Sequence, residues 1–132
     1  MTPELVTNKR LAPHFMEREF DCPCCGFVMV DPKLVTGLED LRGILNGWNS
    51  NIRILINSGY RCTKHNKEVG GVKNSQHLYG RAVDIVVKSG STIIAPADVM
   101  EVAKRLYVFY NGGIGVYRTY LHLDVRGKAA RW

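Results

Sequence analysis

Long hydrophobic runs are missing from this sequence, and so are internal repeats, low-complexity tracts and linkers. Without a run of about 18 apolar residues, no segment is expected to span a membrane. Residues 1–15 lack the apolar stretch of a secretory signal, so we expect a protein made in the cytoplasm without a signal peptide. The lack of internal divisions predicts a single domain over residues 1–132, with residues 1–14 as a loose arm.

A cluster of basic residues interleaved with aromatics is also missing. The 18 Lys and Arg residues outnumber the 12 acidic residues and give a net charge of +6, but they are scattered along the chain. We therefore expect no nucleic-acid partner. The positive charge serves either solubility or attraction to an anionic polymer such as a bacterial cell wall. A hydrophobic content of 45% with 23% charged residues is typical of a globular protein that does not depend on disulfides to fold.

The four cysteines do not follow a standard zinc spacing. Cys22, Cys24 and Cys25 crowd into one short segment, and Cys62 lies far from them in the sequence. A zinc knuckle instead repeats a Cys-x-x-Cys pair. Three interpretations are open: small residues buried around a tight turn, a disulfide from the cluster to Cys62, or a second metal or redox site. We expect the main chemistry of the protein elsewhere.

Two helices are predicted. Asp31 followed by Pro32 is typical of a helix N-terminus, with the aspartate as N-cap. Leucines at helical spacing follow and predict a helix that packs on the core and ends at Gly47. Pro96 opens the second helix, which Asn111 and two glycines stop. The residues expected to face inward from this helix are Val99, Val102, Ala103, Leu106 and Phe109.

Four strands are predicted, over residues 52–56, 82–87, 114–117 and 120–125. A long loop rich in Gly, Asn, Ser and Lys is expected over residues 57–80, and loops of this length in compact domains are usually functional or disordered. The order helix, strand, strand, helix, strand, strand predicts an α+β fold. We expect a mainly antiparallel sheet of about four strands, with the helices packed on one face and a zinc cleft on the other.

Side chains of metal-ligand type recur on one face of two predicted strands. Strand alternation separates Asp84 from its apolar neighbours, and a buried carboxylate is costly unless a cation or hydrogen bonds compensate. In the last strand, His122 and Asp124 share one face, and His77 ends the loop that leads into the earlier strand. Two imidazoles, one carboxylate and an open fourth position are the usual catalytic zinc set. We therefore expect one zinc ion on His77, Asp84 and His122, and a hydrolytic function.

Several motifs occur in a fixed order around these residues. Together they resemble the zinc-dependent D-alanyl-D-alanine carboxypeptidase family of peptidoglycan peptidases, and most closely its small single-domain members from phages and bacteria. The resemblance covers residues 15–132. The motifs are Ser58-Gly-Tyr-Arg61, His65-Asn66, Val69-Gly-Gly71, Ser75-Gln-His77, Gly80-Arg-Ala-Val-Asp84, Gly113-Ile-Gly-Val-Tyr117 and His122-Leu-Asp124.

The resemblance also implies roles for single residues. It implies that His77, Asp84 and His122 are the zinc ligands. Arg61 matches the family arginine that stabilises the scissile carbonyl as it becomes an oxyanion, and the alternative for it is a structural salt bridge. Ser75 matches a serine near the terminal carboxylate of the substrate in some relatives, and its alternative is a turn hydroxyl.

The general base is where the sequence departs from better-known branches of the family. Those branches place a glutamate or a histidine shortly before the last ligand, where this chain has Thr119 and Tyr120. Asp124 remains as the candidate. Its carboxylate could accept the proton of the attacking water, or it could hold the imidazole of His122 in its ligating tautomer.

The resemblance thus predicts a monomeric zinc peptidase that acts on D-amino-acid-containing peptides of peptidoglycan. A phage lysin or a virion-associated enzyme would fit the expected lack of a signal peptide, because lysis or injection brings it to the wall. The alternative is a non-catalytic zinc-containing binding module, because the hedgehog signalling domain shares this zinc site and works by binding partners. Carboxypeptidase and endopeptidase activity are both open.

Overall fold

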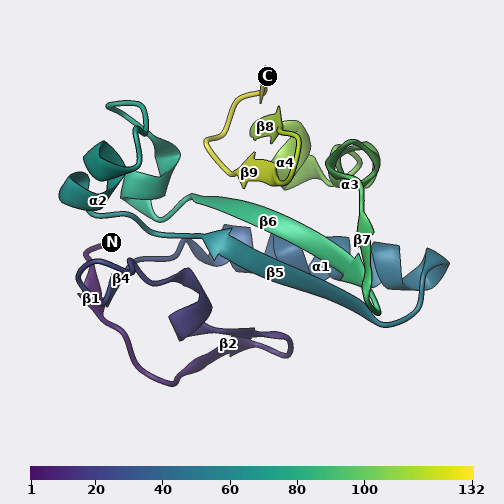
Figure 1. Ribbon diagram of the computed structural model, residues 1–132, viewed down its shortest axis with the longest axis horizontal. Helices are drawn as coiled ribbons and strands as arrows, with labels where there is room; N and C mark the ends of the chain where they lie inside the picture. Colours follow the sequence, from purple (N-terminus) through teal and green to yellow (C-terminus); the bar gives the residue numbers. More distant parts are fainter.

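The computed structural model describes all residues, 1–132 (Figure 1). Its α-helices are α1 (Pro32–Trp48), α2 (Thr63–Glu68), α3 (Pro96–Ala103) and α4 (Tyr107–Tyr110), and its 3-10 helices are η1 (Glu17–Phe20) and η2 (Gln76–Tyr79). Its strands are β1 (Glu4–Leu5), β2 (Arg10–Ala12), β3 (Phe15–Met16), β4 (Phe27–Val28), β5 (Ile52–Ser58), β6 (Ala82–Ser89), β7 (Thr92–Ile94), β8 (Gly113–Val116), β9 (Leu121–Asp124) and β10 (Ala130–Arg131).

The central sheet has six strands in the order β10-β8-β9-β6-β5, and β7 also pairs with β6. All of these pairs are antiparallel except β10 with β8. The α+β class with a mainly antiparallel sheet is therefore confirmed. The four predicted strands correspond to β5, β6, β8 and β9, and the expected number was too low because β7 and β10 are too short to show a periodic pattern.

Helix α1 begins as predicted. The Asp31 side chain accepts a hydrogen bond from the backbone N–H of Lys33 at 3.0 Å, and the helix runs one residue past Gly47. The second predicted helix is divided into α3 and α4. Between them, the N–H groups of Arg105 and Leu106 bond carbonyls three residues earlier, which makes a tighter turn than an α-helix.

The core lies between the sheet and the helices. Val83, Ile85 and Leu123 point from β6 and β9 into this core, together with the buried leucines of α1. Figure 1 shows α1 running behind β5 and β6. Because side chains alternate along a strand, Asp84 and His122 lie on the other face of the sheet. None of the helices has the length and apolar character needed to span a membrane.

Two segments that the sequence predicts as irregular contain structure. The expected loop over residues 57–80 holds the end of β5, helix α2 and helix η2. Within residues 1–14, β1 pairs with β4 and β2 pairs with β3. The buried carboxylate of Glu17 also accepts a hydrogen bond from the backbone N–H of Thr7 at 2.9 Å. Tertiary contacts of this kind stabilise elements whose local propensity is weak.

Candidate active site

Three candidate ligands come from three elements: two neighbouring strands of the sheet and the 3-10 helix η2. The register of β6 and β9 places Asp84 directly opposite His122. His77 lies in η2, where its backbone N–H donates to the Ser75 hydroxyl at 3.2 Å. One ligand-type atom from each of the three residues lies within 4.8 Å of the others. Residues that are separate in the sequence thus form one group.

The two imidazoles converge on a single carboxylate oxygen. Oδ1 of Asp84 lies 3.2 Å from Nε2 of His77 and 3.1 Å from Nδ1 of His122. All three residues are buried, with exposed fractions of 2% to 7%. Two ring nitrogens and a carboxylate oxygen that face one another can hold a divalent cation.

The opposite nitrogen of each imidazole is tied to an acceptor. Nδ1 of His77 lies 2.7 Å from the carbonyl oxygen of Gly59, and Nε2 of His122 lies 2.8 Å from Oδ2 of Asp124. Since neither acceptor carries a proton, each of these nitrogens is assigned as the N–H donor. In the neutral imidazole, the nitrogen that faces Asp84 then keeps a free lone pair, as a metal ligand must; in the protonated imidazole, the same nitrogen donates to Asp84.

The Asp124 carboxylate is fully buried and surrounded by donors. Besides His122, it accepts hydrogen bonds from the backbone N–H of Gly113 at 2.8 Å and from the Arg126 guanidinium at 2.7 and 2.9 Å. A Cβ at Gly113 would collide with this carboxylate, which explains a glycine at this motif position. Asp124 therefore lies behind His122 and has no surface facing solvent.

Arg61 contacts Asp84, the third candidate ligand. Its NH2 group donates to Oδ2 of Asp84 at 3.0 Å, its Nε to Ser58 Oγ at 3.0 Å and its NH1 to Asn66 Oδ1 at 3.3 Å. The arginine thus bonds Oδ2 of Asp84, the oxygen that does not face the imidazoles. Arg61 therefore forms the salt bridge to Asp84 and also lies beside the candidate ligands, so both of its expected roles fit its position.

Hydrogen bonds in the site keep both carboxylates ionised. Burial raises the pKa of Asp84, but hydrogen bonds from His122 and His77 outweigh it and hold this pKa well below its usual range. Burial likewise raises the pKa of Asp124, and the hydrogen bonds from His122 and Arg126 again bring it well below the ordinary value. For His122, burial lowers the pKa, and the bonds to the two carboxylates raise it overall. Negative charge is therefore available for a cation at neutral pH.

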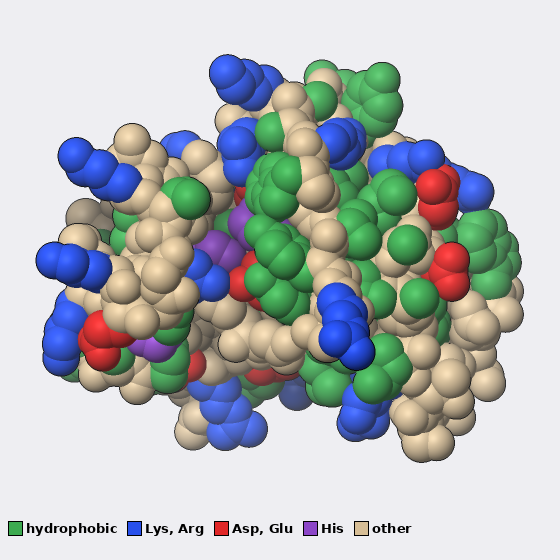
Figure 2. Space-filling view, turned by 45° about the horizontal axis from the view of Figure 1, so that its top comes forward, with side chains coloured by type: hydrophobic (Ala, Val, Ile, Leu, Met, Phe, Trp, Pro, Cys, Tyr) green, Lys and Arg blue, Asp and Glu red, His purple; other side chains and the backbone are tan.

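The ligand group lies at the base of a cleft of about 640 Å³. Figure 2 shows histidine side chains in the hollow at the centre of this face, between basic and hydrophobic side chains. One wall is aromatic. The rings of Tyr117 and Tyr120 stack at 4.4 Å, and the indole N–H of Trp132 donates to the Tyr117 hydroxyl at 2.7 Å. The Trp132 ring also lies 5.0 Å from the ring of His122.

Every site residue predicted from the sequence is in or directly behind this cleft. Arg61 and Ser75 line the cleft together with the three ligands, and Asp124 contacts His122 from behind. The sequence reasoning missed the aromatic wall, above all Trp132. Its position depends on β10 returning beside β8, a parallel pairing of two residues that has no sequence signal. The neighbouring Tyr117 lay within a recognised motif and could have been found there.

Comparison with known proteins identifies the family. The profile of the family described as peptidase M15 matches residues 10–124, most of the chain. A search of the curated proteins gives no match. The matched range contains His77, Asp84 and His122, as well as Arg61 and Asp124. The chain therefore belongs to the peptidase M15 family, the metallopeptidases that include the zinc D-alanyl-D-alanine carboxypeptidases.

Proposed function

We propose that this protein is a zinc-dependent peptidase that hydrolyses a peptide bond in D-amino-acid-containing peptides of bacterial peptidoglycan. The observation that carries the proposal is the convergence of His77 Nε2, Asp84 Oδ1 and His122 Nδ1 at the base of an open cleft. Membership of the peptidase M15 family supports both the reaction class and the substrate class.

The chemistry of the donor set fits zinc. Two neutral imidazoles and a carboxylate are a common ligand set of catalytic zinc, and each imidazole here has its other nitrogen held by an acceptor. Zinc held by three such ligands would supply Lewis acidity and a hydroxide-like nucleophile near neutral pH. We therefore assign His77, Asp84 and His122 as its ligands.

We assign Arg61 to the carbonyl oxygen of the scissile bond. A guanidinium has five N–H donors, and three of those on Arg61 are used by Ser58, Asn66 and Asp84. The two remaining donors belong to a side chain that lines the cleft. They can donate to an oxygen on which negative charge develops, and such a fixed donor stabilises the transition state.

We assign Asp124 as a positioning residue rather than as the proton acceptor. Its two oxygens already accept from His122, Gly113 and Arg126, and none of its surface is exposed to the cleft. Its role is to hold the Nε2–H tautomer of His122, which leaves Nδ1 free to bind the metal. A water molecule in the cleft cannot reach this carboxylate without displacing one of those bonds.

The substrate would lie between the aromatic wall and the segment that precedes η2. Tyr117, Tyr120 and Trp132 offer flat apolar surface to a peptide backbone or to a small side chain such as that of alanine. Across the cleft, Ser75 accepts from the His77 N–H, and its own hydroxyl proton has no acceptor within the chain. This proton can bind the terminal carboxylate or a carbonyl of the substrate.

The charge of the protein supports a place at the bacterial wall. A net charge of +6 favours association with anionic wall polymers. We propose that a monomer acts there, either as a lysin that reaches the wall when a phage lyses the cell or as part of a virion. Both routes deliver the enzyme without secretion.

A non-catalytic zinc-containing binding module is the second candidate. The observation in its favour is that Asp84 is the only carboxylate among the residues that line the cleft, and it belongs to the ligand group. A peptidase would therefore need another group to take up the proton of the attacking water. A binding module would need none.

Mass spectrometry of muropeptides separates the two candidates. Purified peptidoglycan is digested with the zinc-loaded protein, with the His122→Ala variant as a control. A peptidase releases a free amino acid or new peptide termini, and their masses identify a carboxypeptidase or an endopeptidase. Muropeptides that stay intact with a folded, zinc-loaded protein would exclude the peptidase.

A further inference from the structure

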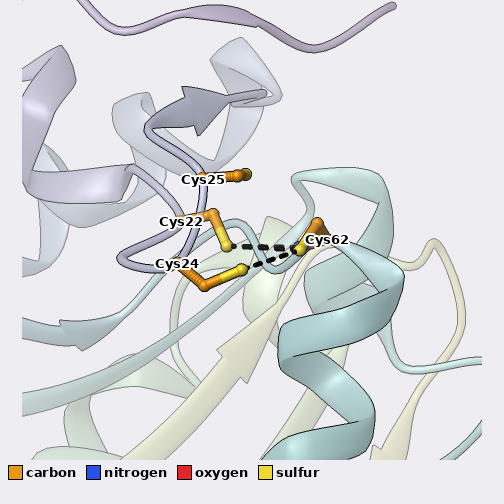
Figure 3. A group of neighbouring side chains, drawn as sticks. All are labelled: Cys22, Cys24, Cys25 and Cys62. Atoms are coloured by element: carbon orange, nitrogen blue, oxygen red, sulfur yellow. Dashed lines mark hydrogen bonds between the residues drawn. The ribbon is translucent and has the colours of Figure 1, made fainter.

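A second group of metal-binding side chains lies outside the cleft. Cys22, Cys24 and Cys25 come from the turn before β4, and Cys62 is the N-cap of α2 (Figure 3). One Sγ atom from each lies within 4.8 Å of the others, and no two are joined in a disulfide. Two segments that are far apart in the sequence thus bring four thiols together.

The sulfur separations suit a tetrahedral metal ion better than a disulfide. Sγ of Cys62 lies 3.7 Å from Sγ of Cys22 and 3.4 Å from Sγ of Cys24. Four sulfurs bound to zinc at about 2.3 Å are separated from one another by about 3.8 Å in a tetrahedron. A disulfide would bring two of them to about 2.0 Å.

The exposure of the cysteines argues against simple core packing. Cys22 is buried, but Cys24 and Cys25 are exposed and Cys62 is only partly buried. Small residues that filled a tight turn would all turn inward. Two exposed cysteines that nevertheless lie beside the other two are better explained by a ligand they share.

Backbone N–H groups stabilise negative sulfur at this site. The N–H of Cys62 points to Sγ of Cys22 at 3.5 Å, and the N–H of His65 points to Sγ of Cys62 at 3.4 Å. The turn itself is fixed by the bond from the Gly26 N–H to the Cys22 carbonyl at 2.9 Å, with Gly26 at a positive φ of 72°. The chain therefore holds the sulfurs in place through its backbone.

We propose that Cys22, Cys24, Cys25 and Cys62 bind one structural zinc ion. Four thiolates this close together repel one another, and a divalent cation removes that repulsion. A set of four sulfurs selects zinc over oxygen-preferring cations such as magnesium and calcium, and it leaves no open position for a substrate. This inference does not depend on the peptidase assignment, because it uses none of the cleft residues.

The proposed zinc would join the N-terminal segment to the turn that supports the cleft. Residues 58–62 connect β5 to α2 and contain Gly59, whose carbonyl accepts from His77, and Arg61. The N–H of Tyr60 donates to the carbonyl of Phe20 at 2.8 Å, and a Cβ at Gly59 would meet the Phe20 backbone. A metal bound to Cys62, the residue after Arg61, would add a second link between residues 58–62 and the N-terminal segment.

Metal counting with site-specific variants tests the proposal. The protein is purified under reducing conditions and its zinc content is measured by elemental analysis. We expect two zinc ions per chain in the wild type, one in Cys24→Ser/Cys25→Ser and one in His122→Ala. The exposed pair is chosen because its replacement leaves the core untouched, and His122→Ala is the matched control that removes the other site.

Cobalt and thiol titrations give a readout that does not depend on activity. Cobalt(II) added to the metal-free protein should produce strong sulfur-to-cobalt absorption in the wild type and in His122→Ala, but not in Cys24→Ser/Cys25→Ser. Zinc should protect all four thiols of the native protein from a thiol reagent. A wild type with one zinc ion and four reactive thiols, or with a mass lowered by a disulfide, would overturn the proposal.

Discussion

The two groups of side chains that could hold a metal ion are built in opposite ways. The ligands in the cleft come mainly from the register of two paired strands, which places Asp84 opposite His122, and all three are buried. The thiols come from a turn and a helix N-cap, and two of the four are exposed. The first group lines a cleft, whereas the second lies outside it.

This difference teaches how a small domain separates chemistry from stability. In the proposed zinc site, three buried ligands would leave a fourth position open for a substrate, and Gly59 and Asp124 would hold the two imidazoles in their ligating tautomers. A zinc ion bound by four thiols would have no open position for a substrate, and it would instead link two segments of the chain. The two groups meet in residues 58–62, where Cys62 follows Arg61 directly.

Removal of a cleft ligand gives the largest expected effect. In His122→Ala, we expect turnover of muropeptides to fall to background and the zinc content to fall by one ion per chain, because two ligands no longer hold the metal tightly. Elemental analysis and mass spectrometry of the same preparation measure both. Full zinc occupancy in this variant would contradict the ligand assignment.

Arg61→Ala comes next in size. We expect it to keep the cleft zinc and to lose roughly a hundred- to a thousandfold in turnover, because a fixed donor to the oxyanion is worth about 3–4 kcal/mol. Arg61→Lys is the matched control, since it keeps the charge but not the planar fork that bonds Ser58, Asn66 and Asp84. A variant that unfolds or stays fully active would show that the salt bridge is purely structural.

Asp124→Asn separates positioning from proton transfer. We expect zinc affinity to weaken by about ten- to a hundredfold, and excess zinc to restore most of the turnover, because the amide no longer holds His122 in its ligating tautomer as firmly. Turnover measured across a zinc titration is the test. If turnover instead fell roughly a hundred- to ten-thousandfold with zinc affinity intact, Asp124 would be the general base.

The sequence predicted the elements with strong local signals. The Asp31 N-cap and the leucine spacing predicted α1, and strand alternation placed Asp84 and His122 on the face opposite the core. The motif glycine Gly113 has a physical cause that the sequence does not reveal. Its backbone N–H donates to Asp124, and no side chain fits beside that carboxylate.

The rest depends on contacts between distant segments. The position of Trp132 follows from β10 pairing with β8, and the spacing of Cys22 and Cys62 follows from the contact of η1 with residues 58–62. Neither contact leaves a periodic pattern in either segment. The sequence showed the cluster and left open a link from it to Cys62, but only the fold shows that all four thiols lie close together.

Cys24→Ser/Cys25→Ser gives the smallest expected effect on turnover and a clear effect on stability. Arg61 keeps its bonds to Ser58, Asn66 and Asp84, so we expect less than about a tenfold loss of turnover at 25 °C. Zinc at a hundred times its Kd stabilises a folded protein by about 2.7 kcal/mol, and this contribution is lost with the thiols.

Thermal unfolding measures this loss and completes the comparison of the two sites. The midpoint should rise with added zinc in His122→Ala through the thiol group, and in Cys24→Ser/Cys25→Ser through the cleft group alone. The wild type should show both increases, since each site binds zinc only in the folded chain. A structural metal must stabilise the folded state that binds it. If the unfolding midpoint of the double variant equalled that of the wild type at every zinc concentration, the thiol group would contribute nothing to stability. The proposed contrast between a catalytic and a structural site would then be wrong.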